Sequence, residues 1–238
     1  MIKAVLFDLD DTLYTSFDEL NEQSYDAIGR WGAEHLGVPA ADFRAAADKW
    51  RKYYHRHLPG EPESHDRVLP MQSVLEEFGA NPVLYAEELD EVYWRTLIDH
   101  MVLRPGIPEL LDELRGRGLK TCVCTNMMIN RQMQKLRRLG LAERFDAFVA
   151  SEEVGKDKPS ALIFKRCLEK CGCAPSEAIM VGDNPEHDIH GAVSVGLHGV
   201  WLNWTHQPKE RCICPHYEAW DVRSVRERIF EIIEKEGI

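Results

Sequence analysis

The chain has 238 residues, of which 44% are apolar and 29% are charged. These fractions are typical of a globular protein and argue against a disordered chain. With 29 Lys and Arg against 40 Asp and Glu, the formal net charge is −11. That charge argues against nucleic acid or an anionic membrane as a partner, whereas an anionic small molecule would need a local cation.

Two features bear on location and redox state. The sequence has no run of 18 apolar residues, and the N-terminal MIKAVLFDLDD places acids directly after a short apolar run. A membrane span or a secretory signal would need a longer apolar segment, so we expect a cytoplasmic protein.

Cys122 and Cys124 are expected to be buried thiols. The remaining cysteines (167, 171, 173, 212 and 214) lack the paired spacing of a structural zinc site.

Short apolar runs predict buried parallel strands over residues 3–7, 120–124, 147–150, 178–181 and 199–202. Helical patterns over 130–139, 160–170 and 189–195 separate the last four runs. Strands that alternate with helices indicate an α/β fold with a parallel sheet.

The segment between the first two strands is different, because it holds more than a hundred mostly helical residues. Periodicity predicts helices over 19–35, 40–54, 70–78, 86–98 and 108–117, with a turn at 103–106 and a loop at 55–65. The sequence therefore predicts a core domain of residues 1–14 and 103–238 and an all-α insertion of residues 15–102.

Polar residues follow the predicted strands at the edge of the sheet where open parallel sheets bind ligands. The segments are Asp8-Leu9-Asp10-Asp11-Thr12, Thr125-Asn126 and Gly182-Asp183-Asn184, with Lys156 and Lys158 before the helix near residue 160. Carboxylates, a hydroxyl, an amide and an ammonium should therefore converge there.

The first segment predicts a metal site. Asp8 and Asp10 are two residues apart at a strand end, so their side chains point the same way and their charges repel. A divalent cation would relieve that repulsion, and Asp183 would add a third oxygen ligand. One carboxylate could then act as a nucleophile and the other as a general acid and base.

Each segment alone has a plainer interpretation. The acids could belong to turns, Thr125 and Asn126 could cap a helix, and Lys158 could be solvated before a helix that Pro159 opens. The order in which all four segments occur is far more specific than any one of them.

Together these segments resemble the haloacid dehalogenase-like superfamily over nearly the whole chain. Its four motifs match Asp8-Leu9-Asp10-Asp11-Thr12 (DxDxT), Thr125, Lys158-Pro159 with Ile163-Phe164, and Gly182-Asp183 with Asp188. The resemblance implies a Rossmann-like core with helices on both faces of the sheet, and the insertion is similar to the class I helical cap.

The resemblance also implies a Mg²⁺-dependent phosphatase that hydrolyses a small phosphate monoester through an aspartyl-phosphate. Asp8 would attack phosphorus, and Asp10 would protonate the leaving oxygen and then activate water. Mg²⁺ would be held by the Asp8 carboxylate, the Asp10 carbonyl and the Asp183 carboxylate. The phosphoryl group, whose transfer needs mainly positioning and charge neutralisation, would be bound by Thr125, Asn126 and Lys158.

Other positions keep open roles. Asp188 would lie behind the metal ligands or pair with the lysine, and Asn184 would orient a metal-bound water or cap the next helix. Thr12 ends the first motif without an assigned role. Lys156 competes with Lys158, which Pro159 favours.

The cap is expected to select the substrate. Its segment Trp50 to His57 is basic and aromatic, and it could contact an anionic or ring-bearing leaving group or form a solvated helix face. His55, His57 and His65 lack the i, i+4 spacing of a helical metal site. The Asp-Asp-Thr-Leu pattern is similar to pyrimidine 5'-nucleotidases and N-acylneuraminate-9-phosphatases, while phosphoglycolate and sugar phosphates stay open. A monomer and a homodimer are both compatible with the sequence.

Three other functions are alternatives to a phosphatase. A sugar-phosphate mutase keeps all four motifs but would need a bisphosphate activator. A 2-haloacid dehalogenase would lack the second aspartate of the first motif, so Asp10 counts against it. An inactive binding module would have lost a nucleophile, lysine or metal ligand, and none is missing here.

Overall fold

The computed structural model describes residues 1–208 and 217–237. Cys212 and Cys214 lie outside these described residues. The chain divides into two compact units. We call residues 1–15 together with 102–238 the sheet unit, and Ser16–Met101 the helical unit. Within the described ranges, no helix is both long enough and apolar enough to cross a membrane.

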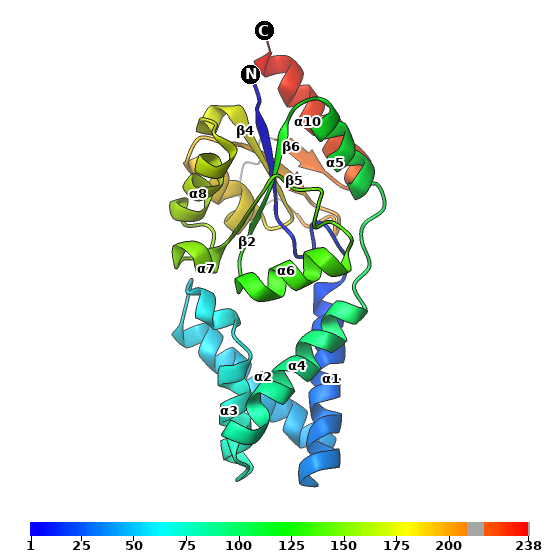
Figure 1. The fold of residues 1–238 in the computed structure, drawn as a ribbon, viewed down its shortest axis with the longest axis vertical. Coiled ribbons are helices and arrows are strands. Elements are labelled where there is room, and N and C mark those ends of the chain that lie inside the picture. Colours follow the sequence, from blue (N-terminus) through cyan, green and yellow to red (C-terminus); the bar gives the residue numbers. More distant parts are fainter. Residues whose placement is uncertain (209–216, 238) are drawn as a thin grey trace. The chain divides into compact units, whose positions relative to one another are not determined.

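The sheet unit is built on one parallel sheet with the strand order β3-β2-β1-β4-β5-β6 (Figure 1). The strands are β1 (Ala4–Phe7), β2 (Lys120–Thr125), β3 (Ala147–Ala150), β4 (Ala178–Gly182), β5 (His198–Leu202) and β6 (Tyr217–Ala219). β1 lies in the middle, where the chain turns from one half of the sheet to the other. The carboxyl end of β1 is therefore the place where such a sheet binds ligands.

Helices cover both faces of the sheet, which confirms the expected fold class. On one face, α8 (Ala161–Cys171) and α9 (Gly191–Ser194) pack on buried side chains such as Leu6, Cys124 and Met180. The other face carries α5 (Ile107–Gly116) and α10 (Val222–Glu236), which Arg226 and Glu113 join at 2.6 Å. Because β1 is buried on both sides, it reads as a continuous apolar run.

The remaining elements of the sheet unit are short. They are α6 (Ile129–Arg138), α7 (Ser151–Val154), a 3₁₀ turn η2 (Pro175–Glu177) and a π-helical turn η3 (Pro185–His190). The helix predicted over 189–195 is instead the end of η3 followed by α9. β6 and α10 lie beyond the last strand that the sequence predicts.

The helical unit contains α1 (Phe17–Leu36), α2 (Ala40–His57), α3 (Val68–Glu77) and α4 (Pro82–Asp99). Helices α1 and α2 pack closely at Gly32, where a Cβ atom would lie 2.3 Å from the Phe43 ring. The loop predicted over 55–65 is wrong at both ends. α2 continues through His57, and a 3₁₀ turn η1 (Pro62–His65) begins with a proline, which the first turn of a helix tolerates.

The basic and aromatic segment Trp50 to His57 forms the end of α2. Trp50 donates to Glu77 at 2.6 Å, and Lys52 pairs with Asp48 at 2.5 Å. The Trp50 and Tyr53 rings meet edge to face with centroids 5.3 Å apart. These contacts lie within the helical unit, and the expected contact of this segment with a leaving group stays a prediction.

Candidate active site

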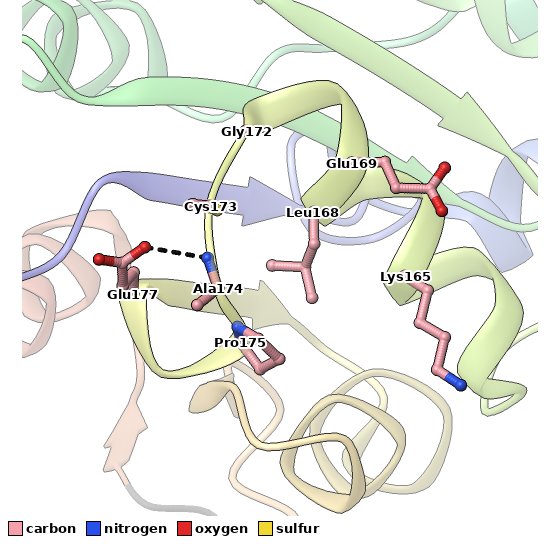
Figure 2. A pocket seen from close by; sticks show the side chains of 8 residues that line it. All are labelled: Lys165, Leu168, Glu169, Gly172, Cys173, Ala174, Pro175 and Glu177. Carbon is pink, nitrogen blue, oxygen red and sulfur yellow. Dashed lines mark hydrogen bonds between the residues drawn. The ribbon is translucent and has the colours of Figure 1, made fainter.

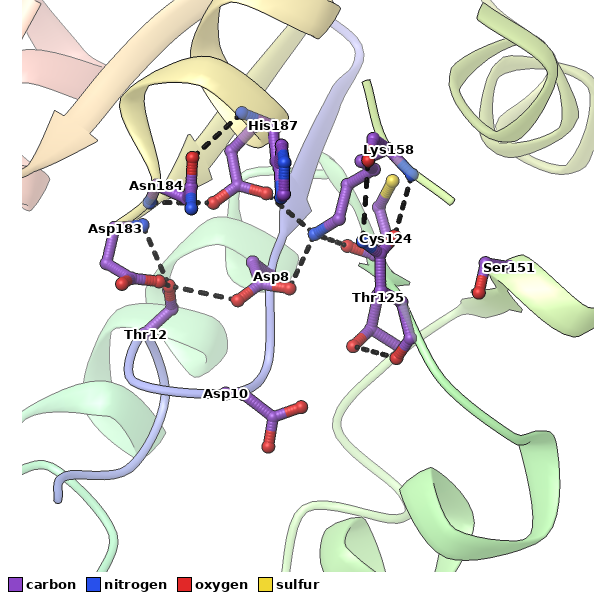
Figure 3. Close-up of polar contacts among 12 residues, drawn as sticks. Asp8, Asp10, Thr12, Cys124, Thr125, Ser151, Lys158, Asp183, Asn184 and His187 are labelled. Atoms are coloured by element: carbon purple, nitrogen blue, oxygen red, sulfur yellow. Dashed lines mark hydrogen bonds and ion pairs between the residues drawn. The ribbon is translucent and has the colours of Figure 1, made fainter. Parts of the chain in front are cut away.

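Asp8 follows β1 directly and is buried. Its N–H continues the β1–β4 ladder by donating to the Val181 carbonyl at 2.9 Å. Its carboxylate accepts a hydrogen bond from the Lys158 ammonium at 2.6 Å (Figure 3). The first predicted carboxylate and the predicted lysine, 150 residues apart in sequence, are therefore in direct contact.

The Lys158 ammonium uses all three of its N–H groups. Besides Asp8, it contacts Asp188 Oδ1 at 2.7 Å and the Cys124 carbonyl at 2.9 Å. Burial alone would lower the pKa of Lys158, but the Asp188 and Asp8 carboxylates raise it well above its usual value. The lysine therefore stays charged in the site. Lys156, the competing lysine, is exposed.

The GDxxxxD segment places Asp188 against Lys158. A Cβ atom at Gly182 would lie 2.2 Å from Asp188 Oδ2, so only glycine leaves room for this carboxylate. Asp188 Oδ2 also accepts the Asn184 N–H at 3.0 Å. The Asn184 side chain accepts the N–H groups of Glu186 and His187 and so caps η3. Of the two roles left open for Asp188, its contacts favour the lysine partner.

Asp8, Asp183 and Asp188 form an acidic cluster in which carboxylate oxygens lie within 4.8 Å of one another. The Thr12 hydroxyl lies 3.1 Å from Asp183 Oδ1 and 3.4 Å from Asp8 Oδ2. Burial raises the pKa of Asp8 to about 7 in spite of Lys158. Burial and the neighbouring Asp188 and Asp8 carboxylates raise the pKa of Asp183 well above its usual value. Three carboxylates and one ammonium leave an excess of negative charge, which fits a divalent cation. The charge of such a cation would lower the pKa values of Asp8 and Asp183 again.

Thr125 and Asn126 lie at the end of β2. The buried Thr125 hydroxyl donates to the Asn126 carbonyl at 3.2 Å. The Asn126 side-chain oxygen accepts the Lys158 N–H at 2.7 Å. The loop after β2 and the loop that carries Lys158, whose bond to Pro159 is cis, are thus tied together.

The Asp10 carboxylate lies apart from the acidic cluster (Figure 3). It accepts hydrogen bonds from Tyr14, from Gln132 at 2.7 Å and from Lys135 at 2.5 Å. Although burial opposes it, the Lys135 charge and the three hydrogen bonds lower the pKa of Asp10. The site thus contains two carboxylates in different environments, with the pKa of Asp8 raised and that of Asp10 lowered.

Several of these contacts are not predicted by the sequence. Gln132 and Lys135 lie on α6, and Trp201, which reads as a core residue of β5, donates its indole N–H to the Asp183 carbonyl at 2.8 Å. Ser151 accepts the Met127 N–H at 3.0 Å. The sequence signal available is the three-residue spacing of Gln132 and Lys135, which puts both side chains on one face of a helix.

A separate pocket lies near the amino end of β4 (Figure 2). Asp8 instead follows the carboxyl end of β1. Its wall is stabilised by Glu177, which accepts the Ala174 N–H at 2.9 Å. The lining residues are Lys165, Leu168, Glu169, Gly172, Cys173, Ala174, Pro175 and Glu177. None of the predicted site residues lines it.

The chain is similar to known proteins over most of its length. Residues 2–196 match the haloacid dehalogenase-like hydrolase family. A ribulose-1,5-bisphosphate 5-phosphatase of Halopiger xanaduensis is 37% identical over 206 residues, which cover 84% of each chain. A pyrimidine 5'-nucleotidase of Escherichia coli is 32% identical over 227 residues, which cover 94% of each chain.

Two solved structures share the fold over nearly the whole chain. A HAD phosphatase from Thermococcus onnurineus has a TM-score of 0.73 and 27% identity over 96% of this chain and 98% of that one. A 2-haloacid dehalogenase from Pseudomonas syringae has a TM-score of 0.79 and 25% identity over 99% of each. The matched family and the named phosphatase relatives agree with the motifs in the site. The chain therefore belongs to the haloacid dehalogenase-like hydrolases and is a phosphoric monoester hydrolase of their phosphatase branch.

Proposed function

We propose that this protein is a Mg²⁺-dependent phosphatase that hydrolyses a small phosphate monoester through a phosphorylated Asp8. The observation that carries the proposal is the contact of the Lys158 ammonium with Asp8 within the acidic cluster, while a further carboxylate, Asp10, is held separately. This arrangement supplies a nucleophile, a cation for the phosphoryl oxygens and an independent proton carrier.

In the first step, an Asp8 oxygen forms a bond to phosphorus while the bond from phosphorus to the ester oxygen breaks. Lys158 and the Thr125 hydroxyl stabilise the charge on the phosphoryl oxygens, and Asp10 gives a proton to the leaving oxygen. In the second step, Asp10 takes a proton from water as the water oxygen attacks phosphorus and Asp8 leaves. The buried setting of Lys158 strengthens its effect, because little water screens it.

The Asp8 and Asp183 carboxylates and the Asp10 carbonyl would hold Mg²⁺. When bound, it would neutralise charge on the phosphoryl group. All three are oxygen ligands, which Mg²⁺ prefers. The raised pKa values of Asp8 and Asp183 support a cation at this place, since two neighbouring buried carboxylates are otherwise costly to ionise.

The names of the relatives suggest the substrate class. They include enzymes for ribulose 1,5-bisphosphate, pyrimidine 5'-nucleotides, glyceraldehyde 3-phosphate, phosphoserine and N-acylneuraminate 9-phosphate. All of these are phosphate esters of small polar alcohols. We propose a substrate of that class.

The test is phosphate release from p-nitrophenyl phosphate and from these five ester types, with Mg²⁺ and with EDTA. Wild type, Asp8→Asn and Asp42→Asn, a control on the exposed surface of α2, are compared. Metal-dependent release that only Asp8→Asn abolishes is expected. Phosphate release that persists in Asp8→Asn would refute the assignment of Asp8 as the nucleophile. Phosphate release that persists in EDTA would refute the dependence on a metal ion. Chloride release from 2-chloropropionate would show a dehalogenase, and a need for a bisphosphate activator would show a mutase.

A further inference from the structure

The Asp10 carboxylate is held by three side chains that come from two parts of the chain. Lys135 Nζ lies 2.5 Å from Oδ1, Gln132 Nε2 lies 2.7 Å from Oδ2, and the Tyr14 hydroxyl donates to Oδ1. Each of the three donors is fully buried. Because both carboxylate oxygens are bonded, rotation of the Asp10 side chain is opposed from two sides.

Helix α6 buries polar groups at a position where apolar side chains would be the ordinary choice. Gln132 and Lys135 are three residues apart, so they share the face of α6 that is turned inward. A buried ammonium is strongly unfavourable unless a charge compensates it. The Asp10 carboxylate supplies that charge, which makes Lys135 difficult to explain as a packing residue alone.

Gln132 connects Asp10 to the phosphate-binding loop. Its amide nitrogen contacts Asp10 Oδ2, the Thr125 hydroxyl oxygen at 2.6 Å and the Asn126 carbonyl at 2.9 Å. Two of these neighbours, the carboxylate and the carbonyl, can only accept, so the nitrogen and not the oxygen of the amide must face them. One side chain thereby sets the distance between the proton carrier and the residue that binds the phosphoryl group.

The loop after β2 is bent to complete this arrangement. Met127 has a φ of 101°, which a residue with a side chain rarely adopts. Its N–H is held by Ser151, and its Sδ lies 3.6 Å from Lys135 Nζ. An unfavourable backbone conformation that survives beside a candidate site indicates that the surrounding contacts enforce it.

We propose that Tyr14, Gln132 and Lys135 form a clamp of positioning residues that fixes Asp10 for proton transfer. This inference rests on the proposed function, and it concerns the second step: all three groups donate to the carboxylate of Asp10, the form that takes a proton from water. The three residues are buried, and they act on the reaction through Asp10. The chemistry would then depend on α6 in addition to the segments that carry the four sequence motifs.

The two steps depend on Asp10 to different degrees when the ester is p-nitrophenyl phosphate. Nitrophenolate is a stable anion, so the bond from phosphorus to its oxygen breaks without a proton from Asp10. In the second step the attacking water must lose a proton as its oxygen bonds to phosphorus and the Asp8–phosphorus bond breaks. A displaced Asp10 should therefore slow the second step and spare the first.

The test follows nitrophenolate release by stopped flow with Mg²⁺ present, in the 238-residue chain. The variants are Lys135→Met, Gln132→Met, Tyr14→Phe and Asp10→Asn, with Arg137→Met as the control that removes an exposed charge from the same helix. In the clamp variants we expect a burst of about one nitrophenolate per active site. The ratio of burst rate to steady-state rate should rise about tenfold or more, within the roughly 10²–10⁴-fold that a positioned acid or base contributes. KM should fall together with kcat, and Arg137→Met should behave as wild type.

The outcomes separate the clamp from the proposed function. An Asp10→Asn variant with wild-type kinetics would refute the role of Asp10 itself. Slowing in Asp10→Asn combined with wild-type kinetics in all three clamp variants would overturn the clamp alone. A merely structural role would lower burst amplitude and steady-state rate together at constant KM, and that result also counts against the clamp. Tyr14→Phe removes a single hydroxyl, so it decides the matter if Lys135→Met fails to fold.

Discussion

The indole N–H of Trp201 and the main-chain carbonyl of Asp183 are joined by a hydrogen bond of 2.8 Å. The N–H of Asp183 is held as well, because it donates to the Thr12 hydroxyl at 3.1 Å. Trp201 belongs to β5 and is almost fully buried. Both main-chain polar groups of Asp183 are thus fixed, one by the side chain of Trp201 on β5 and the other by the side chain of Thr12 in the turn after β1.

The first prediction concerns Trp201→Phe, which keeps an aromatic ring in the core and removes only the indole donor. We expect the Mg²⁺ concentration for half-maximal activity to rise about tenfold, because groups that orient metal ligands typically contribute 10–100-fold to affinity. Activity at saturating Mg²⁺ should stay near wild type. A Mg²⁺ titration of phosphate release measures this, with the exposed Trp220→Phe as control. Equal titration curves for all three proteins would show that the hydrogen bond does not orient Asp183.

The second prediction concerns Gly182→Ala. The added methyl group would lie 2.2 Å from Asp188 Oδ2, so the carboxylate must move and its contact with Lys158 must weaken. We expect kcat to fall by about two orders of magnitude, because small displacements of positioned groups can cost about 10²-fold. The control is Gly116→Ala, at a position where the new methyl group meets no atom within 4 Å. Wild-type kcat in Gly182→Ala would mean that the lysine pair tolerates the displacement.

The sequence predicted the residues that follow strands, because a buried strand and its polar end are local patterns. Asp8 and Asp183 were expected at one edge of the sheet, and they lie together in the acidic cluster. The order of the strands places them there, and the contacts between Lys158 and both Asp8 and Asp188 follow from the same geometry. Short-range patterns sufficed because parallel strands end at the same edge.

The surroundings of Asp10 were not predicted. Gln132 and Lys135 lie 122 and 125 residues from Asp10 in sequence, and α6 reads as INRQMQKLRR, a polar helix with no sign of buried charge. Burial of a lysine is decided by tertiary packing, which a helical pattern does not encode. The π-helical turn η3 was missed for a similar reason, since Asn184 and Asp188 shape it through hydrogen bonds.

The third prediction concerns the stability of the sheet unit at Asp146. Its Oδ2 accepts the N–H of Thr121 at 2.9 Å and the Thr121 hydroxyl at 3.2 Å. Partial burial opposes the shift, but these hydrogen bonds lower the pKa of Asp146. A carboxyl group whose pKa is lowered by folding adds stability above its unfolded pKa of about 3.9, and that stability is lost as the pH falls through the folded pKa.

Asp146→Asn should therefore lower the free energy of unfolding by about 1 kcal/mol at neutral pH. The difference from wild type should shrink as the pH falls below about 4. Urea unfolding across this pH range measures both effects, with Asp42→Asn as the exposed control. A difference that stays constant with pH would show that the charge of Asp146 contributes nothing and that only its shape matters.

The last prediction separates the two acids of the GDxxxxD segment. Asp188 already has a cation, because Lys158 lies 2.7 Å from its Oδ1, and its Oδ2 accepts the Asn184 N–H. Among the residues that the structure describes, no ammonium or guanidinium group pairs with Asp183, whose carboxylate accepts a hydrogen bond from the Thr12 hydroxyl. A divalent cation should therefore depend more on Asp183. We expect Asp183→Asn to raise the Mg²⁺ concentration for half-maximal activity at least tenfold more than Asp188→Asn does. Asp188→Asn should instead lower kcat at saturating Mg²⁺, because the Lys158 ammonium keeps only the Asp8 carboxylate of the two that hold it. Mg²⁺ titrations of phosphate release from both variants measure the two effects, and a larger Mg²⁺ effect in Asp188→Asn would reverse the assignment.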